Sequence, residues 1–267
     1  MQNMYKYPRT YHLDGSGIQR GDEDLSIIPV ANLAGLYVVV EEKMDGANSA
    51  ISFERDGHLL LQSRGHYLTG GPREKQFHLF KAWTYRYVSQ LWEVLRDRYI
   101  LYGEWLYAKH TIFYTDLPHY FLEFDLYDKD MGVFLSTERR KAFLAALPFV
   151  VSVKVLYEGL IHDAQQLVQM IGPSHFINKN HLECLHARCQ EMGLDAAQVL
   201  KETDSSKLME GLYVKVEEDG IVQERYKYVR KSFLQTVFDS ESHWLDRPLL
   251  PNCLKAGTTL FEQVGGR

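Results

Sequence analysis

Two pairs of strand-like runs, each joined by an Asp-Gly dipeptide, restrict the folds that this chain can adopt. The first pair comprises residues 50–53 and 59–61, on either side of Asp56-Gly57. The second pair comprises residues 211–216 and 221–229, on either side of Asp219-Gly220. Because Asp-Gly is a favoured pair in tight turns, the sequence predicts two antiparallel β-hairpins.

The segments between the two hairpins mix helices and strands. Pro72 opens a segment with apolar residues at helical spacing, which predicts a helix over residues 72–98. Residues 99–107 and 120–127 are predicted strands, and residues 137–209 are predicted to be mainly helical with a short strand near 150–157. The absence of a βαβ rhythm in the sequence favours an α+β fold dominated by antiparallel sheet.

Composition excludes several classes of protein. The chain has 267 residues, 45% of them hydrophobic, which is enough for a substantial globular core. Its net charge of −5 argues against a polycation that coats nucleic acid, so such binding would need a local basic patch. No apolar run approaches the ~20 residues that span a bilayer, so we expect no membrane partner. Three cysteines cannot form a disulfide framework, which favours an intracellular, cytoplasmic location.

A single lysine follows the apolar run at residues 36–40 and stands between two acids and an Asp-Gly pair. Lys43 is either a solvated turn residue or an amine presented for chemistry. A lysine amine is a useful nucleophile only when it is unprotonated, which cationic neighbours or a bound metal favour. Attack on a phosphoryl group also needs acids that hold Mg²⁺ and cations that hold the phosphates.

Acids and cations, together with one aromatic residue, occur far from Lys43 in the sequence. They are Glu104 in YGEWLY, Phe124 and Asp125 in YFLEFDLYD, Glu210 and Lys215 in MEGLYVKVEEDG, and Arg225 and Lys227 in ERYKYVRKSF. Each has an ordinary explanation alone, because short motifs have low specificity and charges at strand edges discourage aggregation. These ordinary explanations do not account for the order in which the residues follow one another along the chain.

That order resembles the covalent nucleotidyltransferase superfamily of ATP-dependent ligases and mRNA capping enzymes. The matching elements over residues 36–233 are, in chain order, Lys43-Met44-Asp45-Gly46, Ser63-Arg64, Gly103-Glu104, Phe124-Asp125, Glu210-Gly211 through Lys215, and Arg225-x-Lys227. Glu42 directly before the lysine and Asn48 five residues after it are similar to the RNA ligase 2 type. Arg225 departs from the pattern, since a lysine is usual there, but a guanidinium also binds phosphate.

The resemblance implies a fold and an activity. The fold would be a nucleotidyltransferase (adenylation) domain over residues 1–235, with two mainly antiparallel sheets flanked by helices in an ATP-grasp-like arrangement. The activity would be that of an ATP-dependent RNA ligase using ATP and Mg²⁺ (or Mn²⁺). Lys43 would form lysyl-AMP, AMP would pass to an RNA 5′-phosphate, and a 3′-hydroxyl would then displace AMP. The expected partner is RNA with such ends, in a nicked duplex, and the expected state is a monomer.

The resemblance also implies site residues. Lys43, Glu104, Glu210 and Lys227 would be catalytic. Glu104 and Glu210 would contact metal and ribose, and Asn48 would contact metal-bound water or phosphate. Glu42 would accept from the adenine amino group, Phe124 would stack on adenine, and Arg64 would reach ribose or the terminal phosphates. Lys215, Arg225 and Lys227 would neutralise the α-phosphate.

The second hairpin raises a question of register. A two-residue loop at Asp219-Gly220 pairs 214 with 225, which sets Lys215 and Lys227 on opposite faces of the sheet. For both lysines to reach one phosphate, the loop must have an odd length or a β-bulge must intervene.

Other functions compete with RNA ligation. The residues after Phe233 are too few for the OB-fold domain of DNA ligases and capping enzymes, so residues 236–267 are expected to form a short extension. A minimal DNA ligase, an adenylyltransferase with a different acceptor and an inactive ATP-binding module remain as alternatives. The four zinc-ligand types at residues 181–189 spread over about 200° of one helix, which favours core and surface roles.

Overall fold

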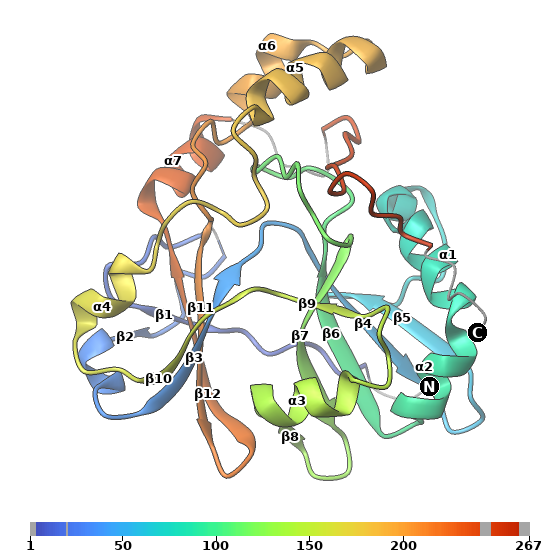
Figure 1. The fold of residues 1–267 in the computed structure, drawn as a ribbon, viewed down its shortest axis with the longest axis vertical. Helices are drawn as coiled ribbons and strands as arrows, with labels where there is room; N and C mark the ends of the chain where they lie inside the picture. The colour runs from blue at the N-terminus through green and yellow to red at the C-terminus, as the bar shows by residue number, and fades with distance from the viewer. Residues whose placement is uncertain (1–3, 20, 241–246, 262–267) are drawn as a thin grey trace.

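The computed structural model describes residues 4–19, 21–240 and 247–261, and it contains two six-stranded sheets. Figure 1 shows the two sheets side by side, with helices around their outer sides and above them. The architecture is therefore the α+β arrangement of two mainly antiparallel sheets that the sequence predicts.

The first sheet has the strand order β10-β3-β11-β12-β1-β2. Its strands are β1 (Tyr11–Leu13), β2 (Ile27–Ile28), β3 (Tyr37–Lys43), β10 (Val155–Leu160), β11 (Gly211–Glu218) and β12 (Ile221–Val229). The pairs β10–β3, β3–β11 and β11–β12 are antiparallel, whereas β1 pairs in parallel with both β12 and β2. The N-terminal strand thus extends the sheet beyond the second hairpin.

The second sheet has the order β5-β4-β6-β7-β8, with β9 paired in parallel to β7. Its strands are β4 (Ala47–Phe53), β5 (Leu59–Ser63), β6 (Tyr99–Trp105), β7 (Phe121–Asp128), β8 (Val133–Phe134) and β9 (Val151–Ser152). The helical elements are η1 (Val30–Leu33), η2 (Pro72–Phe77), α1 (His78–Arg86), α2 (Val88–Leu95), α3 (Thr137–Leu144), α4 (Ala164–Gln169), α5 (His181–Met192), α6 (Ala196–Lys201) and α7 (Lys231–Asp239). Among the described residues, no helix has the length and apolar character needed to cross a membrane.

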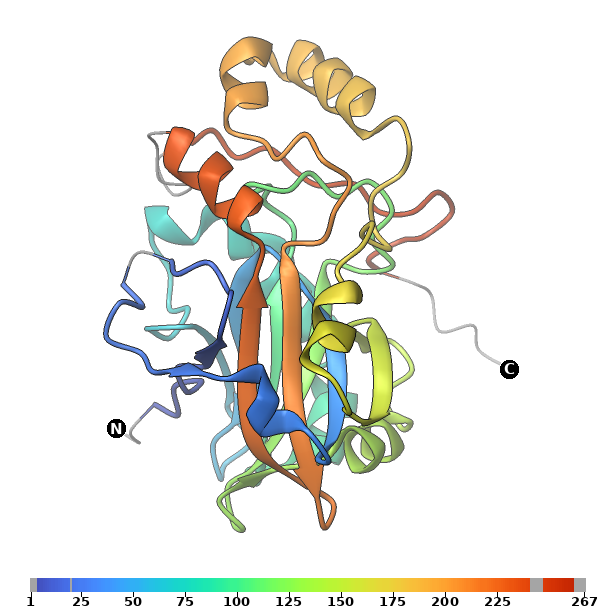
Figure 2. The same cartoon turned by 90° about the vertical axis from the view of Figure 1, so that its left-hand side faces the viewer.

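Each sheet buries one apolar face under helices. On the first sheet, Val40 and Val214 pack with Leu33 of η1 and Leu167 of α4. Figure 2 shows η1 and α4 lying over this face. Burying one such aliphatic side chain stabilises the fold by roughly 1.5–3 kcal/mol, so these contacts fix which faces turn outward.

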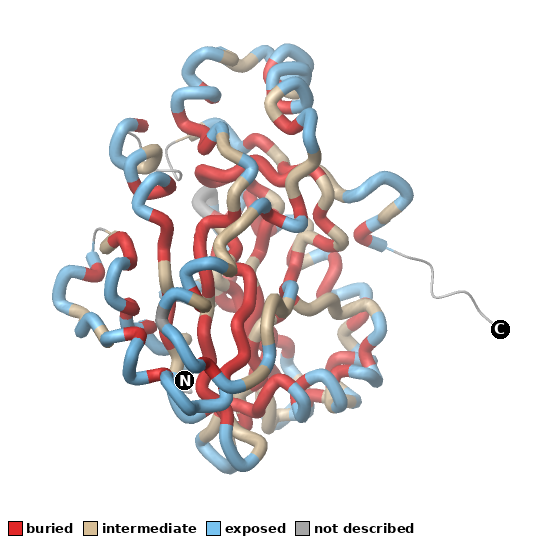
Figure 3. Tube along the Cα trace, turned by 60° about the vertical axis from the view of Figure 1, so that its left-hand side comes forward, coloured by how far each residue is buried: buried red, intermediate tan, exposed pale blue. Residues whose placement is uncertain are grey.

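On the second sheet, the face under α1 and α2 carries an aromatic core. Trp105 packs with Phe80 and Trp83 of α1, and all three are fully buried. Figure 3 shows that the buried residues are concentrated in the strands at the centre of the molecule. The other faces of the two sheets meet, because Lys215 and Arg225 of the first sheet contact Asp125 of the second, and polar strand residues collect between them.

Both hairpins form where Asp-Gly predicts them. In the second hairpin, Glu218 pairs with Ile221 around Asp219 and Gly220, both of which have positive φ (52° and 77°). Two left-handed residues are what a type I′ turn requires. In the first hairpin, the paired strands end at Phe53 and Leu59, so the loop there is longer than two residues.

The single helix predicted over residues 72–98 is wrong in detail. The segment forms a 3-10 turn and two helices that break at Tyr87, whose φ of −111° and ψ of 18° are non-helical. Because the break falls between Trp83 and Leu91, both helices keep a buried side chain against the same core.

The predicted helical region 137–209 contains four helices, α3 to α6, together with β9 and β10. Strand β10 is an edge strand of the first sheet, and α5 and α6 form a pair that projects above both sheets in Figure 1. The segment between α4 and α5 is irregular, and it carries Ser174 and His175 along the first sheet.

The C-terminal segment 247–261 packs back onto the second sheet's connecting loop. Backbone hydrogen bonds join Asn252 to Tyr107 and Cys253 to Tyr114. The Asn252 side chain is 1% exposed, accepts from the Tyr114 N–H at 2.9 Å and donates to the Leu106 carbonyl at 2.8 Å. This segment therefore belongs to the core around the loop that follows β6.

Candidate active site

Lys43 lies where the chain crosses from the first sheet to the second. It is the last residue of β3, and β4 begins only four residues later at Ala47. Gly46, within this crossover, approaches β6 so closely that an added Cβ would lie 2.8 Å from the Trp105 carbonyl oxygen. Only glycine fits there, which explains the glycine of the Lys-x-Asp-Gly element.

Asp45 fixes the crossover to the loop that follows β6. Its Oδ2 accepts backbone hydrogen bonds from Thr111 and Ile112, each at 2.7 Å. The Asp45 N–H donates to the Tyr114 hydroxyl at 2.9 Å. With both the side chain and the backbone of Asp45 held, the lysine two residues earlier leaves β3 in a defined direction.

Glu210 is the direct partner of Lys43. Lys43 Nζ donates to Glu210 Oε1 at 2.6 Å, and the two strands align so that Lys43 pairs with Gly211. An added Cβ on Gly211 would lie 1.9 Å from the Tyr228 carbonyl oxygen, so the glycine after Glu210 is required by the approach of β12. Glu210 is 1% exposed, and among the described residues its Oε2 has no hydrogen-bond partner.

Glu104 and Asn48 face the same site from the second sheet. They are paired directly across β4 and β6, so their side chains lie on one face of the sheet. Gly103, next to Glu104, could not carry a side chain, because an added Cβ would lie 2.5 Å from the Phe121 ring. An added Cβ on Gly46 would also lie 3.0 Å from Glu104 Cγ, so Glu104 lies against the crossover that carries Lys43. The predicted nucleophile and both predicted acids therefore lie in one site.

The charges at this site strongly perturb one another. Burial raises the pKa of Glu104 to about 8 and that of Glu210 to about 7, although Lys43 opposes both shifts. Burial also disfavours the Lys43 ammonium, but Glu210 and Glu104 outweigh it and raise the pKa of Lys43 above its ordinary value. The protein alone therefore keeps Lys43 protonated, and added positive charge must oppose the carboxylates before the amine can attack.

The donor set fits a hard divalent cation completed by a substrate. Glu104, Glu210 and Asn48 supply oxygen ligands, which Mg²⁺ and Mn²⁺ prefer, and Glu210 Oε2 is a buried acceptor still lacking a donor. No group of three or more His, Cys, Asp or Glu side chains that could hold a metal occurs in the described part of the chain. Mg²⁺ is typically held by one or two carboxylates plus substrate phosphates, so this set suits a metal that arrives with a nucleotide.

A β-bulge in the second hairpin sets the predicted cations on one face. Val216 pairs with Glu224 but Glu217 pairs with Val222, so Gln223 is an extra residue in β12. As a result, Lys215 pairs with Arg225 and Tyr213 pairs with Lys227. Side chains two residues apart lie on the same face of a strand, so Lys215, Arg225 and Lys227 share one face. Of the two arrangements that would allow this, an odd loop or a β-bulge, the hairpin has the β-bulge.

Lys215 lies on this face but is fully engaged in buried ion pairs. Its Nζ lies 2.9 Å from Glu41 Oε2 and 3.0 Å from Asp125 Oδ1, and it also donates to the Phe124 carbonyl. Glu41 in turn accepts from Arg140 of α3 at 2.7 Å. A layer of opposite charges between the sheets therefore fixes the Lys215 ammonium.

Arg225, which stands where a lysine is usual, is held by an acid and an aromatic ring. Its guanidinium carbon lies 3.7 Å from the centre of the Phe134 ring, and its Nε lies 3.6 Å from Asp125 Oδ2. A planar guanidinium stacks on a ring where an ammonium would not, so this environment suits arginine specifically.

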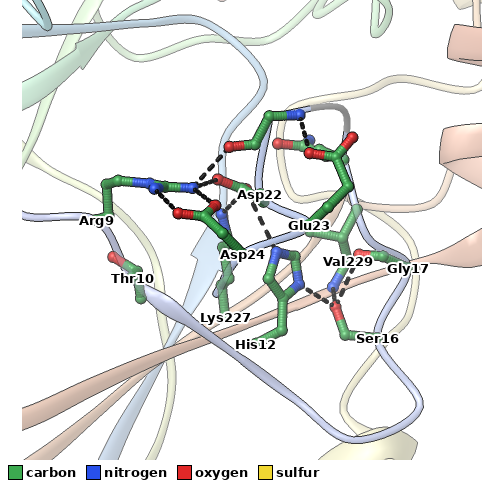
Figure 4. A network of polar contacts seen from close by, with 12 residues as sticks. Arg9, Thr10, His12, Ser16, Gly17, Asp22, Glu23, Asp24, Lys227 and Val229 are labelled. Carbon is green, nitrogen blue, oxygen red and sulfur yellow. Dashed lines mark hydrogen bonds and ion pairs between the residues drawn. The ribbon is translucent and has the colours of Figure 1, made fainter. Parts of the chain in front are cut away.

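Lys227 is paired with an acid from the N-terminal segment. Its Nζ lies 2.5 Å from Asp22 Oδ2, and both side chains are buried (Figure 4). Desolvation and Lys43 lower the pKa of Lys227, while Asp22 raises it. Desolvation and Lys227 likewise lower the pKa of His12, which also contacts Asp22, and this favours a neutral imidazole.

Phe124 and Arg64 border the site from the second sheet. A bulge places Gly103 opposite Glu123 but Tyr102 opposite Asp125, so Phe124 is the extra residue of β7. Phe124 and Asp125 can therefore both reach the layer between the sheets, and the Phe124 ring lies 6.2 Å from that of Tyr213. Arg64 follows β5, is exposed, and interacts electrostatically with Glu104.

Glu42 lies on the other face of β3 from Lys43. Its Oε1 accepts from Ser174 Oγ at 2.5 Å, and its Oε2 lies 2.9 Å from His175 Nδ1. Alternation along a strand sends adjacent side chains to opposite faces, so Glu42 anchors the segment before α5. Of the ten residues predicted for the site, Glu42 is the one whose carboxylate this geometry directs away from the others.

The structure adds several residues that hold the site and that no sequence motif indicates. Asp22 binds Lys227, Gln19 Nε2 donates to Glu210 Oε1 at 3.3 Å, and Glu41 binds Lys215. No local pattern identifies them, because each reaches its partner across the sheet or from a distant segment. On α5, by contrast, His181 and Cys189 are buried while Cys184 is exposed, as the helical spread of the four zinc-ligand types predicts.

The fold and the site together define a domain of the nucleotidyltransferase type with a lysine at its centre. The chain belongs to the RNA ligase family, whose model matches residues 36–229. The fold is similar to solved structures of the Naegleria gruberi RNA ligase, including substituted forms with ATP and Mn and with AMP and Mn, and the ligase with PPi. Each shares 21% identity with a TM-score of 0.52 and covers 79% of this chain.

The chain spans about half of each of those ligases, 54% of their length. No curated protein matches it. The structural similarity therefore supports the fold, and the family match extends over the whole segment from β3 to the end of β12.

Proposed function

We propose that this protein is an ATP-dependent RNA ligase that seals 5′-phosphate and 3′-hydroxyl ends through lysyl-AMP and RNA-adenylate. The observation that carries this proposal is the position of Lys43 at the crossover between the sheets, hydrogen-bonded to Glu210. An amine held among carboxylates that can also bind a cation suits phosphoryl transfer from a nucleotide.

In the first step, the neutral Lys43 amine attacks the α-phosphorus of ATP. A P–N bond forms, the P–O bond to the β-phosphate breaks, pyrophosphate leaves, and the amine loses its proton. A divalent cation, Mg²⁺ or Mn²⁺, supplies positive charge to the phosphates and opposes the carboxylates that hold Lys43 protonated. Glu104, Glu210 and Asn48 would hold it, the last through water.

The remaining site residues have roles that follow from their positions. Lys215, Arg225 and Lys227 share the face of the first sheet that carries Lys43, and their positive charges suit the α-phosphate. Phe124 is available for stacking on adenine, and the exposed Arg64 for ribose or the terminal phosphates. Glu42 contributes indirectly in this proposal, by holding Ser174 and His175 against the first sheet.

The proposed partner is a nicked RNA duplex, bound by a monomer inside the cell. A chain with a net charge of −5 has few phosphate contacts to offer, so ends already aligned by a bridging strand favour reaction. We propose that residues 1–235 form the adenylation unit and that residues 236–267 extend it. The small number of cysteines, three in the whole sequence, supports the proposal of a reducing compartment.

The deciding experiment incubates the protein with α-labelled ATP and Mg²⁺, followed by denaturing electrophoresis. We expect a labelled band that is acid-labile and base-stable, and that is absent from the Lys43→Ala variant. Absence of a band from the wild-type protein with ATP would refute the proposal. A band with GTP alone would instead indicate a capping-type enzyme.

A second experiment identifies the acceptor. Purified protein is given matched RNA, DNA and mixed nicks at two salt concentrations. We expect faster sealing when the 3′-hydroxyl strand is RNA, because a 2′-hydroxyl distinguishes RNA from DNA there. Equal or faster sealing of the all-DNA nick would favour a minimal DNA ligase, and lysyl-AMP without sealing would indicate another acceptor.

A further inference from the structure

The N-terminal segment lies outside the residues that match the RNA ligase family model, yet it reaches the candidate active site at two points. Asp22 binds Lys227 at 2.5 Å, and Gln19 Nε2 donates to Glu210 Oε1 at 3.3 Å. We propose that Asp22 is a positioning residue, which holds the Lys227 ammonium on the phosphate side of the site. This inference rests on the proposed adenylation of Lys43.

Asp22 is held by a second cation besides Lys227. Arg9 Nη2 lies 3.4 Å from Asp22 Oδ1 and also donates to the Gly21 carbonyl at 2.6 Å. Asp24 binds the same guanidinium at 2.6 Å. Figure 4 shows this guanidinium lying against the loop that carries Asp22, so the carboxylate is fixed from the solvent side.

His12 fixes the same carboxylate from the protein side. Its Nε2 lies 3.3 Å from Asp22 Oδ2 and its Nδ1 lies 2.9 Å from Ser16 Oγ, while Ser16 Oγ accepts from the Val229 N–H at 2.9 Å. A neutral His12 with its proton on Nε2 completes this chain from β12 to Asp22. His12 also pairs with Lys227 in the sheet, so the imidazole that holds Asp22 and the lysine that Asp22 binds come from neighbouring strands.

The consequence concerns the freedom of a lysine side chain. A free lysine has about 2 kcal/mol of rotamer entropy, and an ammonium can point in many directions. The Lys227 ammonium has three N–H donors, and Asp22 accepts from one of them. The other two remain for an arriving phosphate. Because a misplacement of about 1 Å can cost ~100-fold in rate, loss of the tether should slow the chemical step more than ATP binding.

The test compares Asp22→Asn and Asp22→Ala with Glu23→Gln as the matched control. Glu23 is the adjacent acid, is exposed, and accepts from the Gly21 N–H at 2.7 Å. Single-turnover labelling with α-labelled ATP yields the rate at saturating ATP and the ATP concentration for half the maximal rate. Thermal unfolding of each variant reports on folding.

We expect the saturating rate to fall about 10- to 100-fold in Asp22→Ala, with a smaller fall in Asp22→Asn, which keeps one acceptor oxygen. The half-saturating ATP concentration should change little, and Glu23→Gln should match the wild type. In a Lys227→Met background, Asp22→Ala should cause no further loss, because the residue acts through Lys227.

Other outcomes overturn the inference. A higher saturating rate or a lower half-saturating ATP concentration in Asp22→Ala would mean that Asp22 competes with phosphate for Lys227. An additional loss in the Lys227→Met background would mean a general structural role. A wild-type protein that forms no lysyl-AMP would refute the proposed function itself, whereas normal labelling of both Asp22 variants would refute only this inference.

Discussion

Lys43 Nζ lies 2.6 Å from Glu210 Oε1, and this contact joins the end of β3 to the residue that precedes β11. The two charges belong to one unit, because each shifts the pKa of the other. The carboxylate thus orients the amine while it also remains available to a cation through its second oxygen.

Replacing Glu210 with glutamine keeps the size of the side chain and removes its charge. We expect lysyl-AMP formation to fall by ~10²-fold or more, because a preorganised electrostatic partner is lost. Glu218→Gln, an exposed change at the far end of β11, is the control. Labelling of Glu210→Gln at the wild-type rate would contradict the assigned role, and the same assay on Glu104→Ala tests the second acid.

Gly211→Ala should destabilise the fold. Its Cβ would lie 1.9 Å from the Tyr228 carbonyl oxygen, so β11 and β12 would have to separate. Forced overpacking of this kind costs about 1–3 kcal/mol or more. Thermal denaturation would measure this loss against Gly65→Ala, where an added Cβ meets nothing within 4 Å. Equal unfolding temperatures for the two variants would argue against so close an approach of the two strands.

The buried ion layer predicts a contrast between two glutamates. Glu41→Gln removes the negative charge that pairs with the buried Lys215 and Arg140, and it should lower the free energy of unfolding by roughly 3–5 kcal/mol. Glu158→Gln breaks an exposed pair with Lys141 and should cost under about 1 kcal/mol. Chemical denaturation of both variants tests this, and similar small losses would mean that the layer tolerates a missing charge.

The hydrogen bonds of Asn252 predict that the C-terminal segment stabilises the crossover that carries Lys43. Asn252→Ala leaves the Tyr114 N–H and the Leu106 carbonyl without their side-chain partner, at about 1–3 kcal/mol for each buried group. Because the Tyr114 hydroxyl binds the Asp45 N–H, adenylation should slow as well. Asn32→Ala, at an exposed position, is the control. Unchanged stability and labelling in Asn252→Ala would separate this segment from the site.

His119 predicts a pH dependence of stability. Burial lowers its pKa from 6.5 to about 4, so between these values the unfolded chain binds more protons and stability falls as the pH falls. The pKa shift of His119 therefore adds roughly 3 kcal/mol to the free energy of unfolding above pH 6.5, at ~1.4 kcal/mol for each unit of pKa, relative to the value below pH 4.

His119→Asn removes that titration while an amide oxygen can still accept from the Phe121 N–H, as Nδ1 does at 3.0 Å. The difference in unfolding free energy between the wild type and this variant should shrink as the pH is lowered from about 7 to about 4. A constant difference over this range would show that His119 titrates normally in the folded protein.

The sequence by itself determined the local elements and the identity of most chemical groups. Asp219-Gly220 specifies its turn through the positive φ of both residues, and the order of Lys43, Glu104 and Glu210 indicates the family before any geometry is known. Turn formation depends on neighbouring residues alone, and motif order is a property of the chain. Both can therefore be predicted from the sequence.

Only the tertiary structure decided which face each side chain takes and which distant groups meet. One extra residue, Gln223, moves Lys215 and Lys227 onto one face, and alternation sends Glu42 to the other. Asp22 meets Lys227 only because β1 pairs with β12. Strand order and the presence of a bulge depend on the packing of residues that are far apart in the chain, and the turn sequence alone does not encode such contacts.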